Sequence, residues 1–395
     1  MPKYLDEFHP PTRLLMGAGP SNVNPRVLRA MSAPLLGHLD PDFIGVMDDV
    51  KSMLRLVFQT NNNLTIPISG TGTAGMEAAL VNVLEPGDTL VTAVNGYFGG
   101  RLSDIGARCG ARVHQIDTPW GEPVDPAAVE SELRKHPKVK AVAMVHAETS
   151  TGVLSPVEEI ARIAHRHNAL LILDTVTSLG GVEVAVDRWD VDVCYSGTQK
   201  CLGCPPGLAP ITLSPRAEEA LNHRKTPVQS WYFDLSLLSS YWGDNRAYHH
   251  TAPISMIFGL REGLRVVLEE GLQKRFQRHQ GNAAALRAGL LALGLELFAK
   301  DGCRLPSLTS VHVPSGVTDA RVRTALLRTY NIEIGGGLGP VAGKVWRIGL
   351  MGENSYPSSL FTLLSALETI LTGEGYEVAP GVALAAAQQV IAGAT

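Results

Sequence analysis

Ala169-Leu-Leu-Ile-Leu-Asp174 and Val191-Asp-Val-Cys-Tyr-Ser-Gly-Thr-Gln-Lys200 are the two stretches of this chain that decide its fold. Each contains an apolar run rich in branched residues and ends in polar residues, which is typical of a buried strand. Asp174 and Lys200 are therefore expected near the carboxyl ends of two strands. Open α/β sheets build their sites at that edge.

An acid and a lysine brought together at a sheet edge suit pyridoxal 5′-phosphate (PLP). The lysine amine can form a Schiff base, and the carboxylate keeps the pyridine nitrogen protonated so that the ring accepts electrons. The alternative is a buried ion pair that only orders a loop.

Strand and helix patterns alternate from about residue 64 to 215, which predicts an α/β fold with a mostly parallel sheet. The length of 395 residues indicates two or three domains. We expect an extended N-terminal segment over residues 1–20 and a large cofactor-binding domain over 21–255. A smaller α+β domain over 256–378 would begin with one long helix, and an Ala-rich helical tail would occupy 379–395.

The composition excludes several classes of protein. Hydrophobic residues make up 45% of the chain and charged residues 18%, which argues against disorder. A net charge of -4 without a basic stripe makes nucleic acid a poor partner. Five scattered cysteines do not resemble a disulfide framework, and no signal or membrane-spanning segment stands out. We therefore expect a cytoplasmic protein. We also expect no bound metal, since His249 and His250 lack a third ligand.

A glycine- and threonine-rich loop, Gly70-Thr-Gly-Thr-Ala-Gly75, opens a predicted helix from Met76 to Leu84. Free N–H groups and the positive dipole end of a helix suit a phosphate, so Thr71, Gly72 and Thr73 are predicted to cradle one, with a plain structural turn as the alternative. The three glycines also spell the dinucleotide fingerprint. Pro67 in the preceding strand, and Asn95 in place of an acid after the next, argue against that use.

Three further positions have two interpretations each. The loop around Gly19 could bring backbone N–H groups to a ligand carboxylate, or it could be a simple turn. Tyr97 and Phe98, predicted on a glycine loop, could lie against a planar ligand or pack in the core. Arg347 lies in an apolar strand and must be paired, either with a protein acid or with an incoming substrate carboxylate.

Together these stretches resemble the class V aminotransferases of fold type I, in the alanine:glyoxylate and serine:pyruvate aminotransferase branch. The resemblance runs from about residue 16 to 350. It rests on Ser69-Gly-Thr-Gly72, Glu148-Thr-Ser-Thr-Gly152, Asp174, Tyr195-Ser-Gly-Thr-Gln-Lys200, Tyr248-His-His-Thr251 and Lys344-Val-Trp-Arg-Ile-Gly349. It implies a fold type I PLP-transferase with a mostly parallel seven-stranded sheet and a smaller C-terminal domain.

The resemblance also implies a role for each site residue. Lys200 is the Schiff-base lysine and moves the proton during catalysis, Asp174 pairs with the pyridinium nitrogen, and Phe98 stacks on the ring. Arg347 binds the α-carboxylate of the substrate, and Gly19 is the second substrate-binding residue. The remaining cofactor contacts are implied for Thr71, Gly72, Thr73, Thr149 and Gln199, and for Tyr248 and Thr251 of the partner subunit in a homodimer with shared active sites.

The implied activity is transamination of alanine or serine with glyoxylate or pyruvate as acceptor, in ping-pong fashion through pyridoxamine phosphate. Another reaction of the same cofactor is the alternative: cysteine desulfuration, or transamination of kynurenine-type or phosphonate substrates. A desulfurase needs a mobile cysteine in the second domain, where Cys303 is the only candidate. An NAD-dependent oxidoreductase and a non-catalytic dimeric scaffold are more remote.

Overall fold

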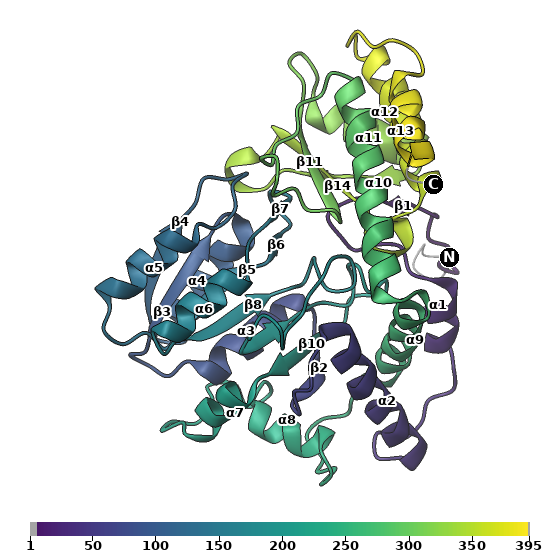
Figure 1. Cartoon of the computed structure of the whole chain (residues 1–395). Coiled ribbons are helices and arrows are strands. Elements are labelled where there is room, and N and C mark those ends of the chain that lie inside the picture. Colours follow the sequence, from purple (N-terminus) through teal and green to yellow (C-terminus); the bar gives the residue numbers. More distant parts are fainter. Residues whose placement is uncertain (1–5, 394–395) are drawn as a thin grey trace.

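A seven-stranded sheet forms the centre of the computed structural model, which describes residues 6–393 (Figure 1). Only β10 runs antiparallel to its neighbours, so the α/β class and the mostly parallel sheet are confirmed. In spatial order the strands are β2 (Thr65–Ser69), β10 (Leu208–Leu213), β9 (Val193–Tyr195), β8 (Leu170–Asp174), β5 (Ala141–Val145), β3 (Thr89–Val94) and β4 (Arg112–Asp117).

The central strands of this sheet are buried on both faces. Every residue of β3, β5, β8 and β10 is buried, and successive side chains of a strand point to opposite faces. Helices must therefore cover both faces, as they do in α/β proteins. Those of the first 250 residues are α1 (Pro25–Met31), α2 (Pro41–Phe58), α3 (Gly72–Val83), α4 (Tyr97–Arg108), α5 (Pro126–Lys135), α6 (Glu158–Arg166), α7 (Pro215–Asn222) and α8 (Leu235–Trp242).

The two edge strands differ in exposure. Pro67 lies in β2, at the edge of the sheet, which is where a strand tolerates proline. The opposite edge strand, β4, is only partly buried along its length. Helix α5 packs against β4 and is joined to it by residues 118–125.

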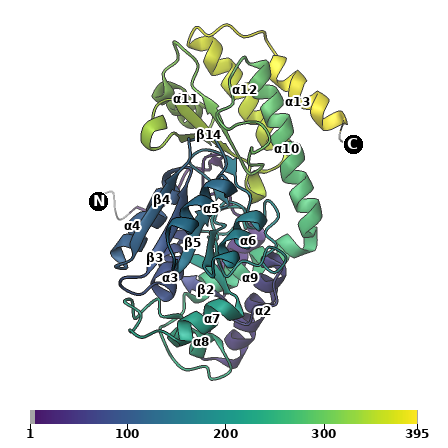
Figure 2. The same cartoon turned by 60° about the vertical axis from the view of Figure 1, so that its left-hand side comes forward.

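A second, smaller sheet lies beside the first and has its own hydrophobic cluster, which includes Trp346 and Leu286 (Figure 2). Strand β14 (Val345–Gly349) is its centre, flanked antiparallel by β11 (Leu308–His312) and β13 (Gly335–Gly336). Helices α11 (Asp319–Thr329), α12 (Pro357–Gly373) and α13 (Val382–Gly393) complete this part. The exact domain limits given above remain a prediction, and residues 1–5 and 394–395 lie outside the described chain.

The prediction of a single long helix after residue 254 is wrong. The segment forms two helices, α9 (Ile254–Glu270) and α10 (Leu272–Ala292), which are separated by Gly271 with a φ of 83°. A left-handed glycine ends a helix without steric cost, while the apolar spacing continues on both sides of it. The predicted tail helix exists as α13, and its Ala383 and Ala387 are buried against the C-terminal core.

The segment before α1 joins the two halves of the molecule. Strand β1 (Leu14–Leu15) pairs with β12 (Ile332–Glu333), and Met16 is buried in the C-terminal hydrophobic cluster. Five residues later, Ser21 N donates a 2.9 Å hydrogen bond to the carbonyl of Gln199. Among the described helices, none combines the length and apolarity that crossing a bilayer requires.

Candidate active site

A cavity of about 250 Å³ lies at the carboxyl ends of β5 and β8. It brings together seven of the residues predicted from the sequence: Gly72, Thr73, Phe98, Thr149, Asp174, Gln199 and Lys200. Its wall also contains Met76, Arg101, Val145 and Val176, which the sequence did not single out. A larger, more open cavity of about 690 Å³, lined by Thr89, Arg112 and Leu170 among others, lies at the opposite ends of the strands and contains none of the predicted residues.

Asp174 is the last residue of β8 and is buried. Its Oδ1 accepts a hydrogen bond of 2.8 Å from Val176 N, and its Oδ2 accepts one of 2.7 Å from the Tyr195 hydroxyl. Burial raises the pKa of Asp174 to about 6, because a carboxylate loses its hydration there. A cationic ring nitrogen would stabilise the ionised form of this carboxylate.

Lys200 follows β9 in a turn, and its amine faces the N-terminal segment. Nζ donates a hydrogen bond to the carbonyl of Ala18. A Cβ on Gly19, whose φ is +101°, would lie only 2.5 Å from Nζ, so a side chain here would displace the lysine and strain the backbone. Burial, reinforced by the nearby guanidinium of Arg347, lowers the pKa of Lys200 to about 8. The amine therefore becomes neutral at a much lower pH than an exposed lysine.

The N-terminus of α3 forms one end of the cavity and fits a phosphate group. No side chain caps this helix, which leaves its first N–H groups available. A guanidinium lies close by, since Arg101 Nη1 donates a 3.0 Å hydrogen bond to Thr73 Oγ1. Gln199 Oε1 is buried and has no hydrogen-bond partner among residues 6–393. Thr71, at the N-cap, is exposed and does not line the cavity.

Phe98 lies in the first turn of α4, so the prediction that Tyr97 and Phe98 are on a loop is wrong. The helix begins this early because Glu148, completely buried, takes the place of an N-cap. Its Oε2 accepts hydrogen bonds from Phe98 N at 3.1 Å and Gly99 N at 3.2 Å, and its Oε1 accepts two more from Ser150. A carboxylate suits the positive end of a helix. Glu148 thereby fixes the backbone that carries the aromatic wall of the cavity.

Arg347 is buried in β14 and has only neutral partners. Its Nε donates to the carbonyl of Gly336 at 2.7 Å, and its Nη1 approaches the carbonyl of Thr149 at 3.3 Å. No carboxylate of residues 6–393 forms an ion pair with it. Burial lowers its pKa, although a guanidinium remains charged. The sequence left two partners open for Arg347, a protein acid or a substrate carboxylate. Within the described residues no protein acid pairs with it.

Tyr248 and Thr251 are exposed and lie outside the cavity of their own chain. Tyr248 is 61% exposed, and its ring contacts that of His38 at a centroid distance of 5.1 Å. Their expected position at the cofactor of a partner subunit stays a prediction.

Residues 13–351 match the class-V aminotransferase family. The chain belongs to this family. The resemblance seen in the sequence is thereby confirmed, and membership in the class V aminotransferases implies PLP as the cofactor. The nicotinamide alternative is set aside.

Individual class V relatives cover nearly the whole chain. The (S)-ureidoglycine–glyoxylate transaminase of Bacillus subtilis is 43% identical over 97% of this chain and 96% of its own length. A crystal structure of the ureidoglycine–glyoxylate aminotransferase from the same organism has a TM-score of 0.96 at 44% identity, covering 98% of this chain and all of the other. An alanine–glyoxylate aminotransferase structure from Nostoc sp. is 50% identical, with a TM-score of 0.91 over 93% and 97% of the two chains.

Proposed function

We propose that this aminotransferase uses glyoxylate as amino acceptor and a small amino acid, alanine or serine, as donor. The observation that carries the proposal is Arg347, a buried guanidinium beside the cavity with only carbonyl partners. Such a group binds a carboxylate through two parallel hydrogen bonds, and both an amino acid and a 2-oxo acid carry one. The names of relatives at 43–50% identity all include glyoxylate as a substrate.

A second donor deserves equal testing. The relative that covers 97% of this chain is named for (S)-ureidoglycine, and its structure superposes with a TM-score of 0.96. Ureidoglycine is also small and carries an α-carboxylate, so Arg347 would bind it in the same way as alanine.

The site residues are proposed to divide the work as follows. PLP, when bound, supplies a pyridinium ring that stabilises negative charge at the substrate Cα. Asp174 holds the proton on the ring nitrogen, and Phe98 lies against the ring. Lys200 Nζ removes the proton from Cα and returns one. With a pKa of about 8, this amine is close to the operating pH, as an efficient proton carrier should be.

The phosphate of the cofactor is proposed to bind Gly72 N–H, the Thr73 backbone and hydroxyl, and the Gln199 amide. Thr149 is proposed to contact the phenolic oxygen side of the ring. Its hydroxyl is already oriented by a hydrogen bond with Thr177 Oγ1. Gly19 contacts Lys200 and has no side chain. We propose that this leaves room for the substrate carboxylate next to Arg347.

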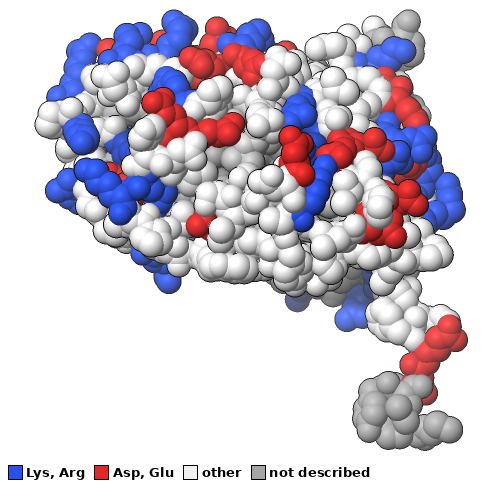
Figure 3. Space-filling view, turned by 90° about the horizontal axis from the view of Figure 1, so that it is seen from below, with Lys and Arg blue, Asp and Glu red and all other residues white. Residues whose placement is uncertain are grey.

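We further propose that two subunits share their active sites, with Tyr248 and Thr251 reaching the phosphate bound by the partner. The support is a set of exposed large apolar side chains within residues 226–251, namely Trp231, Tyr232, Leu237 and Tyr248. The rings of Trp231 and Tyr232 both contact His249. Exposed aromatic clusters of this kind mark protein interfaces. Uncharged side chains also cover a broad part of the face seen from below (Figure 3).

Half-reactions followed by absorbance test the proposal. The PLP-loaded enzyme is mixed separately with L-alanine, L-serine, (S)-ureidoglycine and L-cysteine, and then with glyoxylate or pyruvate. We expect the visible cofactor band to disappear with a small amino donor and to return with glyoxylate. Ratios of kcat/KM then identify the donor. A band that responds to none of the first three donors, or sulfide release from cysteine, would overturn the proposal.

A further inference from the structure

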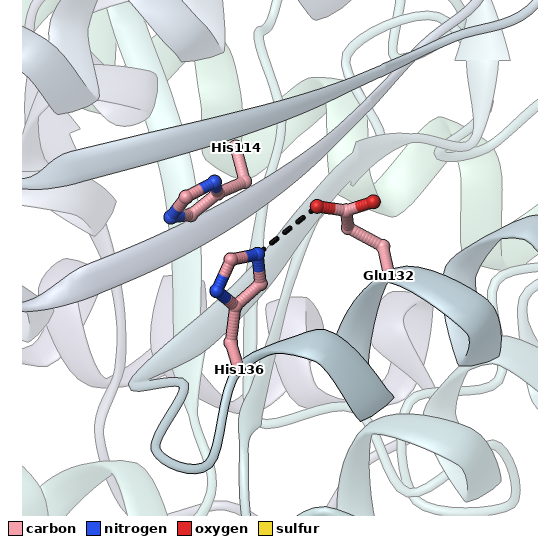
Figure 4. A group of neighbouring side chains, drawn as sticks. All are labelled: His114, Glu132 and His136. Atoms are coloured by element: carbon pink, nitrogen blue, oxygen red, sulfur yellow. Dashed lines mark hydrogen bonds and ion pairs between the residues drawn. The ribbon is translucent and has the colours of Figure 1, made fainter.

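Three side chains of types that bind metals meet on the outer edge of the large sheet (Figure 4). None of them lines the active-site cavity. His114 projects from the edge strand β4, Glu132 from α5, and His136 follows the last residue of that helix. Because Glu132 and His136 are four residues apart, they share one face at the end of the helix. One ligand atom from each of the three residues lies within 4.8 Å of the others.

The contacts within this group are close. His136 Nε2 lies 3.0 Å from Glu132 Oε1, and the rings of His114 and His136 have centroids 3.7 Å apart at an angle of 31°. Figure 4 shows both imidazole rings beside the one carboxylate. The second oxygen of Glu132 accepts a 2.7 Å hydrogen bond from Lys135, which orients the carboxylate from outside the group. All three potential ligands are half-buried.

A hydrogen bond between His136 and Glu132 explains that pair but leaves His114 unexplained. Across residues 6–393, neither ring nitrogen of His114 has a hydrogen-bonding partner, although the ring is stacked against His136. His114 therefore holds an unpaired imidazole next to the imidazole of His136 and the carboxylate of Glu132. An empty metal site would have this arrangement.

We propose that His114, Glu132 and His136 bind a divalent transition-metal ion, with zinc as the expected ion. Two imidazoles and one carboxylate, with water in the fourth position, are a known ligand set for zinc. Magnesium and calcium prefer ligand sets made only of oxygen, so they suit this group poorly. The imidazole nitrogen that binds the metal must carry no proton, so a proton held on that nitrogen moves to the other nitrogen of the ring or leaves to solvent.

The expected consequence of binding is structural. β4 is the partly exposed edge strand, held within the sheet only by β3. A metal bound by one residue of β4 and two residues at the end of α5 would fasten this edge to the helix that covers it. The site therefore adds to the proposed transamination without taking part in it.

Calorimetric titration of the PLP-loaded full chain with zinc chloride tests this proposal, alongside His114→Ala, Glu132→Gln and His136→Ala. We expect each substitution to weaken the binding step by at least about tenfold. The rise in melting temperature caused by zinc should be lost in the same three variants. Transaminase activity measured without added metal should stay unchanged, since none of these residues lines the active-site cavity.

His9→Ala is the matched control, because His9 also faces a carboxylate, that of Glu7 at 3.5 Å, but forms part of no cluster of three potential ligands among residues 6–393. This variant should bind zinc as the unmodified chain does. Wild-type zinc affinity in all three cluster variants would overturn the proposal. So would the absence of zinc binding in the unmodified chain. Loss of activity in a variant would indicate misfolding, and circular dichroism distinguishes this from loss of a ligand.

Discussion

Replacing Glu148 by glutamine isolates the contribution of one buried carboxylate to the fold of the active site. The carboxylate accepts four hydrogen bonds, two from backbone N–H groups of α4 and two from Ser150. Glutamine has almost the same shape but only one oxygen acceptor. Its best orientation keeps that oxygen towards α4 and turns the NH₂ group to donate to Ser150 Oγ.

In this orientation the backbone N–H of Ser150 loses its acceptor, and the Ser150 hydroxyl must turn its proton away from residue 148. An unpaired buried N–H costs about 1–3 kcal/mol. Losing the negative charge at the N-terminus of α4 costs about 0.3–1 kcal/mol more. We therefore expect Glu148→Gln to lower the free energy of unfolding by roughly 1.5–4 kcal/mol.

Urea unfolding followed by circular dichroism measures this difference. The experiment is done at pH 8, because burial raises the pKa of Glu148 and the carboxylate must be ionised in the unmodified protein. The midpoint should fall without a change in the m-value. Glu130→Gln is the control. Its ion pair with Arg134 at 2.9 Å lies at the surface, and its loss should leave the midpoint in place. An unchanged midpoint for Glu148→Gln would refute the reasoning.

Three further outcomes are expected. Lys200→Ala should lower transamination by at least about 10²- to 10⁴-fold without moving the urea midpoint, because it removes the proton carrier; activity near the wild-type level would contradict this role. Arg347→Lys should reduce kcat/KM by about 10- to 100-fold, mainly through KM, since an ammonium cannot form the paired hydrogen bonds; an unchanged KM would contradict carboxylate binding. PLP should associate with the apoenzyme faster as pH rises, with a midpoint near 8, because the neutral form of Lys200 reacts. Arg347→Met should move this midpoint to higher pH, because it removes a positive charge that lowers the pKa of Lys200. A midpoint near 10.5 in the unmodified protein would show that burial does not lower the pKa of Lys200.

The strands and the cofactor cavity were predictable because their signals are local. Uninterrupted apolar runs identify β5 and β8, and a glycine-rich loop before an apolar helix identifies one end of the cavity. Asp174 and Lys200 could be placed together because the carboxyl ends of neighbouring strands meet at one edge.

What the sequence did not reveal depends on contacts between distant residues. Glu148 starts α4 from 50 residues away, so no local cap signal shows that Tyr97 and Phe98 are helical. Arg101 enters the cavity only because α4 lies beside α3. His114 joins Glu132 and His136 by strand–helix packing, whereas metal motifs read from sequence need closely spaced ligands.

The N-terminal segment sets an order of events during protein synthesis. It carries Gly19 against Lys200, but Leu14 pairs with Ile332, and Met16 accepts a 2.8 Å hydrogen bond from Gly349 N. During synthesis, strand β1 has no pairing partner until β12 has been made, and the carbonyl of Met16 has none until Gly349 has been made. The large sheet and the residues that line the cavity all lie between residues 65 and 213, so they can fold earlier, whereas Arg347 arrives only with β14. A chain that ends before β14 would hold Asp174 and Lys200 at the cavity but would lack the guanidinium of Arg347.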